Sequence, residues 1–141
     1  MIPLKVHNVI DYIAAVALVL APAIFGFADI VAARNIFLIL GAGLFGYSLF
    51  TDYDYSVAKV IPLRIHMGFD VASGIALMVS PWLFGYVNAI RGGDLAVHFI
   101  FGLAVIGLVT FTDKHRMGLS SSSATSDSST SKDERTIRKI A

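Results

Sequence analysis

The sequence contains no cysteine and few charged residues. The absence of cysteine excludes disulfides, thiolate metal sites and cysteine nucleophiles. Charged residues make up 15% of the 141 residues, hydrophobic residues make up 56%, and the mean hydropathy is +0.74. Soluble domains are usually about 25% charged and about 45–50% apolar. This departure indicates a membrane protein, and the net charge of +1 gives no indication of a nucleic-acid partner.

Long runs of the chain carry no charged residue. They are 12–28, 35–51, 71–90 and 95–112. Each run suits a transmembrane helix, which needs roughly 17–25 mostly apolar residues. The sequence therefore predicts an all-α integral membrane protein with four transmembrane helices and the lipid bilayer as its partner. We expect the helices near 8–27, 33–51, 67–87 and 95–112.

The first half of the chain resembles the second half. Residues 2–27 align without gaps with residues 61–86, so that IPLKVHNVID is matched by IPLRIHMGFD. The segments that follow also correspond, and each ends in Phe-Thr-Asp. Such extended self-similarity indicates an internal duplication. We expect tandem helical hairpins at 1–60 and 61–116, followed by a disordered Ser-rich cytoplasmic tail at 117–141.

The repeat also predicts the topology. Two helices per repeat return the chain to its starting side, so the hairpins share one orientation about a pseudo-two-fold axis along the membrane normal. One predicted side carries Lys5, Lys59, Arg64, Lys114 and Arg116, and the other carries Arg34 and Arg91. By the positive-inside rule both termini are cytoplasmic.

The segment Ser80-Pro81-Trp82-Leu83-Phe84-Gly85 predicts a helix end. Pro81 removes a backbone donor, and the hydroxyl of Ser80 is a candidate partner for the carbonyl that this frees. Trp82 is typical of the aromatic belt at a membrane interface. Gly85 accepts the left-handed conformation that closes a helix. The first copy retains the proline, as Pro22, and replaces the serine and the tryptophan with alanine.

This segment resembles the signature of the SPW repeat family, small prokaryotic membrane proteins with a Ser-Pro-Trp motif in the first of two transmembrane helices per repeat. The resemblance covers roughly residues 2–113. It implies a multi-pass protein of the prokaryotic cell (inner) membrane, and it implies no reaction.

A histidine and an aspartate lie four residues apart in each copy, as His7 and Asp11 and as His66 and Asp70. This spacing places each pair on one helical face, with the histidine at the cytoplasmic surface and the aspartate about one turn deeper. The pseudo-two-fold axis brings the pairs together. Asp52 and Asp113, each after a threonine, end the second helices on the same side.

Three interpretations of these polar groups remain open. In the first, His–Asp and Thr–Asp groups are polar clasps that tie helix ends together. In the second, the cluster is a proton or ion site, because intramembrane carboxylates mark such paths. In the third, it binds a divalent metal. The clasp is the preferred interpretation, so no metal or other cofactor is expected.

Other polar and small residues receive structural interpretations. Ser80 is not expected to be a nucleophile, because its equivalent is Ala21 and the histidines of the repeat lie on the other side. His98 aligns with Phe37 and is expected at the membrane interface. Small residues on the second helices allow close packing and a homo-oligomer: Gly41, Ala42, Gly43, Gly46, Gly102, Ala104 and Gly107.

The sequence therefore predicts a non-enzymatic membrane protein, structural or interaction-mediating. No nucleophile, cofactor motif or strong metal spacing is recognisable. The alternative is a small proton or ion transport protein that uses Asp11 and Asp70.

Overall fold

The computed structural model describes residues 2–52 and 56–112. Over these residues the chain forms α1 (Leu4–Phe25), α2 (Val31–Phe50), α3 (Leu63–Leu83) and α4 (Gly92–Phe111). Each helix is long and apolar enough to cross a membrane. Large apolar side chains on all four helices face outward, as the bilayer requires. The prediction of an all-α membrane protein with four transmembrane helices is confirmed.

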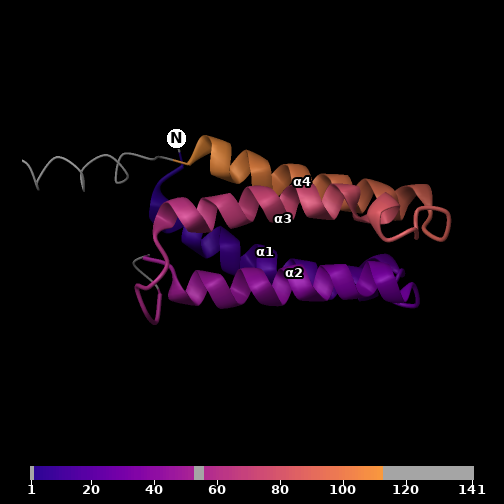
Figure 1. Ribbon diagram of the computed structural model, residues 1–141, viewed down its shortest axis with the longest axis horizontal. Helices are drawn as coiled ribbons and strands as arrows, with labels where there is room; N and C mark the ends of the chain where they lie inside the picture. The colour runs from indigo at the N-terminus through magenta and orange to yellow at the C-terminus, as the bar shows by residue number, and fades with distance from the viewer. Residues whose placement is uncertain (1, 53–55, 113–141) are drawn as a thin grey trace, which may run out of the picture.

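The helices are arranged as two hairpins. Helix α1 packs chiefly against α2, and α3 packs chiefly against α4. The hairpins lie alongside each other, with smaller contacts of α2 with α3 and of α1 with α4. The N-terminal end of the chain and the loop between α2 and α3 lie at the same end of the bundle (Figure 1). We call this the loop end, and the opposite end, with the two connections inside the hairpins, the hairpin end.

The helix boundaries differ from those that we expected. α1 and α3 begin at Leu4 and Leu63, about one turn earlier than expected. Each follows a proline in extended conformation, Pro3 or Pro62, whose carbonyl accepts the first hydrogen bonds of the helix. Proline suits a helix start because the first backbone N–H groups have no partner within the helix.

The ends of α1 and α3 use the same device. Gly26 and Gly85 have φ angles of +79° and +69°, the left-handed conformation that glycine adopts without strain. The expected helix end at Gly85 is therefore present, although α3 ends at Leu83 rather than near residue 87.

Glycines allow the helices of each hairpin to approach closely. A Cβ atom at Gly41 would lie 2.9 Å from the carbonyl oxygen of Ala15, and one at Gly102 would lie 2.6 Å from that of Gly74. These small residues thus pack within a hairpin. Gly43, Gly46 and Gly107 have open space around them, so a homo-oligomer through these positions stays a prediction.

Short backbone pairings join the hairpins at the loop end. Ile61 donates to the carbonyl of Phe50 at 2.8 Å, and Ile2 donates to that of Phe111 at the same distance. Ile2 and Ile61 are equivalent in the repeat alignment, as are the two phenylalanines. The start of each hairpin is therefore bonded to the end of the other. The expected tail at 117–141 lies outside the described residues.

Candidate functional site

Four ionisable side chains meet inside the bundle near the loop end. They belong to the first eight residues of α1 and of α3, and we call them the His–Asp cluster: His7, Asp11, His66 and Asp70. All four are buried, with the two aspartates 2% and 1% exposed. Both histidines are fully buried within the bundle, and their expected depth at the cytoplasmic surface of the membrane stays a prediction. The helices begin a turn earlier than expected, so that even their first turns contribute to the bundle interior.

The contacts of the cluster cross between the hairpins as well as along each helix. His66 Nε2 lies 3.1 Å from Asp11 Oδ2 and 3.2 Å from Asp70 Oδ2. His7 Nε2 lies 3.4 Å from Asp11 Oδ2 and 3.5 Å from Asp70 Oδ2. Each histidine therefore faces both carboxylates through the same ring nitrogen.

The other ring nitrogen of each histidine meets a threonine of the opposite hairpin. His66 Nδ1 lies 2.8 Å from Thr51 Oγ1, just after α2. His7 Nδ1 lies 2.7 Å from Thr112 Oγ1, just after α4. Both threonines are buried. Of the Thr–Asp groups that we interpreted as clasps, the threonines thus contribute hydroxyl groups that point inward to the imidazole rings.

The neighbouring aspartate at the end of α2 takes no part in the cluster. The Asp52 carboxylate is 60% exposed and forms an ion pair of 3.2 Å with Lys59. Its counterpart Asp113 lies outside the described residues. Of the three described aspartates considered for this rim, the structure brings Asp11 and Asp70 together.

Tyr47 is a partner of the cluster that our sequence analysis missed. Its hydroxyl donates a hydrogen bond of 2.6 Å to Asp70 Oδ1. The residue lies on α2, one turn before Thr51, on the same helical face. That spacing was the available signal. The equivalent position in α4 is Leu108, so the repeat provides no equivalent tyrosine for Asp11.

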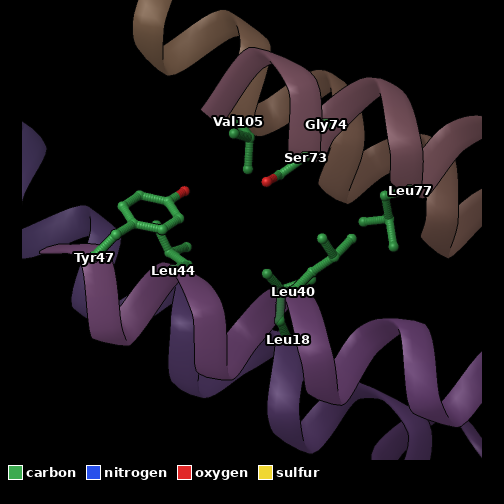
Figure 2. Close-up of a pocket in the computed structure, with 8 residues that line it drawn as sticks. All are labelled: Leu18, Leu40, Leu44, Tyr47, Ser73, Gly74, Leu77 and Val105. Atoms are coloured by element: carbon green, nitrogen blue, oxygen red, sulfur yellow. The ribbon is translucent and has the colours of Figure 1, made fainter. Parts of the chain in front are cut away.

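A small cavity adjoins Tyr47 between the hairpins. Figure 2 shows the hydroxyls of Tyr47 and Ser73 directed toward it from α2 and α3, with four leucines, Val105 and Gly74 along the rest of its wall. Its volume is about 10 Å³, close to the least that holds one water. None of the four cluster residues lines it.

A second buried polar group lies toward the hairpin end. Ser80 Oγ donates to the carbonyl of Leu77 at 2.8 Å, which is the carbonyl that Pro81 leaves without its usual helical donor. The Tyr86 hydroxyl lies between Ser80 Oγ and His98 Nε2, 3.1 Å from the latter. Burial raises the pKa of Tyr86, so its hydroxyl keeps its proton and can donate it.

His98 is fully buried within the bundle, and its expected position at the membrane interface stays a prediction. Its Nδ1 donates to the carbonyl of Asp94 at 2.7 Å, and its ring packs against Phe27 and Phe37 of the first hairpin. Since His98 is itself hydrogen-bonded at both nitrogens, it can lie in the core without an unpaired polar atom.

A comparison with protein families shows which family this chain belongs to. The sequence profile of the SPW repeat domain matches residues 5–112. This range is most of the chain, and it covers all four helices except Leu4, the first residue of α1. The chain belongs to the SPW repeat domain family. No curated protein and no solved structure is similar to it.

The SPW motif has a clear structural role in this chain. Its serine bonds the carbonyl that its proline frees, and both residues are buried. Its tryptophan, Trp82, is half exposed on the outer surface, where its ring contacts Phe99. The motif thus ends α3 with its polar groups paired on the inside and an aromatic ring on the outside.

Proposed function

We propose that this SPW repeat protein has a structural or interaction-mediating role in the membrane rather than an enzymatic one, and that the His–Asp cluster holds its hairpins together. The direction of the contacts carries this proposal. His66 bonds Thr51 and approaches Asp11, both in the first hairpin. His7 makes the equivalent contacts with the second hairpin. Each histidine therefore joins the hairpins at two points.

The packing between hairpins explains why such contacts matter. Helices in a bilayer have no hydrophobic driving force toward one another, because lipid tails are as apolar as the helix surfaces. The close contacts at Gly41 and Gly102 lie within the hairpins, so they do not stabilise the interface between the two hairpins. Buried polar contacts therefore stabilise the association of the hairpins in addition to the van der Waals packing between them.

The double substitution Asp11→Leu/Asp70→Leu tests this role by unfolding in mild detergent. We expect a loss of about 3–5 kcal/mol, because both histidines would remain buried without carboxylate partners. Asp52→Asn is the matched control, since it changes an exposed carboxylate at the same end of the bundle. Unchanged stability of the double variant would contradict the proposed role.

Transport through Asp11 and Asp70 is the alternative function, and it has less support. Both carboxylates are almost completely buried, and the small cavity beside Tyr47 is not lined by either of them. A transporter needs its carboxylates to reach water from at least one side. Aspartate-dependent proton or cation flux into proteoliposomes would favour transport over the structural role.

We further propose that the protein resides in a prokaryotic cell (inner) membrane with the loop end in the cytoplasm. Lys5, Lys59 and Arg64 lie at this end, whereas Arg34 and Arg91 lie at the hairpin end. The absence of natural cysteine makes the test direct. Asp29→Cys should react with an impermeant maleimide added outside cells, and Asp52→Cys should react only after lysis.

A further inference from the structure

We propose that the His–Asp cluster binds one divalent transition-metal ion of the zinc type, ligated by Nε2 of His7 and His66 and by one oxygen each of Asp11 and Asp70. The inference rests on the proposed structural role and deepens it, because the ion becomes the cation that links the hairpins. Its basis is the hydrogen-bond direction around the imidazole rings.

The tautomer of His66 follows from its threonine partner. The hydroxyl of Thr51 donates its single proton to the carbonyl of Tyr47 at 2.6 Å, and a carbonyl can only accept. Thr51 Oγ1 must therefore accept the hydrogen bond from His66 Nδ1, which carries the proton. In the neutral ring, Nε2 is then left with an unprotonated lone pair.

His7 is held in the same way by the opposite hairpin. The hydroxyl of Thr112 donates to the carbonyl of Leu108 at 2.6 Å, so its oxygen accepts from His7 Nδ1. Both rings are thus fixed with Nδ1–H outward and Nε2 inward. Histidine ligands of metals are typically oriented by a hydrogen bond at the second nitrogen in this manner.

At the centre of the cluster, the described groups that approach the two inward nitrogens are carboxylate oxygens. The two Nε2 lone pairs approach the carboxylate oxygens at 3.1–3.5 Å. Asp70 Oδ2 is buried and receives no hydrogen bond of acceptable geometry. Ionised carboxylates cannot donate. Protons or a metal ion must therefore occupy the centre of the cluster.

The nitrogen–oxygen distances of the cluster are close to those around a tetrahedral ion. Zinc binds histidine nitrogen and carboxylate oxygen at about 2.0–2.2 Å, which places the ligand atoms of a tetrahedron about 3.3–3.5 Å apart. The four nitrogen–oxygen distances are 3.1, 3.2, 3.4 and 3.5 Å. One ligand atom from each residue lies within 4.8 Å of all the others, so the most distant pair has to draw together by about 1 Å when a tetrahedral ion binds.

Charge and ligand type also favour a zinc-like ion. Two carboxylates and two neutral imidazoles leave a double negative charge, which a divalent cation cancels inside the bundle. Calcium prefers 6–8 oxygen ligands, and magnesium retains several waters, so two imidazoles and a dry site suit neither. Tyr47 supports the site by bonding Asp70 Oδ1, which leaves Oδ2 for the ion.

The test is metal analysis of the full chain, purified in detergent from zinc-supplemented cells with a tag free of histidine. After dialysis against EDTA, we expect the wild type to retain about one zinc ion per chain, as one four-ligand site requires. Asp11→Asn/Asp70→Asn should retain less than a tenth of this amount, because a neutral amide is a poor zinc ligand.

The asparagine variant should still fold. Each amide can donate a hydrogen bond to an Nε2 lone pair, and Tyr47 keeps an acceptor at residue 70. Asp52→Asn is the control and should retain zinc as the wild type does. If the wild type retains no zinc, or if the asparagine variant retains the same amount, the metal site is refuted. A different result would contradict the proposed structural role of the cluster, namely unchanged stability of Asp11→Leu/Asp70→Leu. The two proposals can therefore fail independently.

A spectroscopic measurement provides a second test that does not depend on the asparagine variant. Protein produced with Co²⁺ in place of zinc should show the intense visible bands of tetrahedral cobalt, lost on addition of zinc. Thr51→Val should weaken metal binding about 10–100-fold, the usual effect of losing the partner of a ligand histidine. Weak octahedral bands, or unchanged affinity in Thr51→Val, would contradict the proposed ligand set.

Discussion

The two buried polar groups of this protein differ in how the repeats contribute to them. In the His–Asp cluster, both repeats supply the same residue types, and each histidine bonds the opposite hairpin. Toward the hairpin end, the polar chain of Ser80, Tyr86 and His98 lies wholly in the second hairpin. We call this chain the Ser–Tyr–His group.

The first repeat has apolar residues where the second has the Ser–Tyr–His group. Ala21, Phe27 and Phe37 occupy the equivalent positions, and the two phenylalanine rings pack edge to face at 5.1 Å. A polar group confined to one hairpin can be replaced as a unit by apolar residues, because its donors and acceptors leave together. When a polar group is shared between the hairpins, replacing its residues in one hairpin alone leaves buried polar atoms of the other hairpin unpaired.

The largest effect is therefore expected from a single histidine of the cluster. His66→Phe removes the nearer of the two imidazole partners of both carboxylates, and the imidazole partner of Thr51, in one step. We expect a loss of about 3–5 kcal/mol in the free energy of unfolding, since buried charges lose their compensation. The measurement is reversible unfolding in mixed detergent micelles. His98→Phe provides the comparison, and an equal loss for both variants would remove the distinction between the two groups.

The threonine partners should show smaller and equal effects. Thr51→Val and Thr112→Val keep the side-chain shape but remove the acceptor of a buried imidazole N–H. We expect each to cost about 1–3 kcal/mol, the penalty for an unsatisfied buried donor. Thr110→Val is the control, because Thr110 is exposed and bonds only the carbonyl of Ile106. A clear inequality between the first two variants would mean that the hairpins do not use the cluster equivalently.

The sequence predicted the fold better than it predicted the cluster's partners. Charge-free runs predicted all four helices, since hydrocarbon thickness requires such runs whatever the packing. The repeat indicated that His7 and His66 belong together, but not which way their rings point. The pairing of Thr51 with His66 depends on the rotation of α2 against α3, and helical spacing does not determine this rotation. The pairing of His98 with Tyr86 was not predicted, because Tyr86 lies in a loop without periodic pattern.

An intermediate effect is expected when the Ser–Tyr–His group is only partly removed. Tyr86→Phe deletes the hydroxyl between Ser80 and His98, and it leaves His98 Nε2 buried without a donor. We expect a loss of about 1–3 kcal/mol, as for other unsatisfied buried groups. The same unfolding assay measures it. A neutral result would show that water or the serine hydroxyl replaces the tyrosine.

The smallest loss of stability is expected from a triple variant that replaces the whole Ser–Tyr–His group at the hairpin end. The triple variant Ser80→Ala/Tyr86→Phe/His98→Phe gives the second hairpin the residues that the first already has at the equivalent positions. Replacing all members of a hydrogen-bonded group by apolar residues of similar shape is often nearly neutral. We expect the free energy of unfolding of the triple variant to lie within about 1 kcal/mol of that of the wild type. The triple variant should therefore be more stable than Tyr86→Phe alone. Such non-additivity is measured by a mutant cycle. Simple addition of the three single losses would show instead that the polar chain stabilises the second hairpin beyond satisfying its own buried atoms.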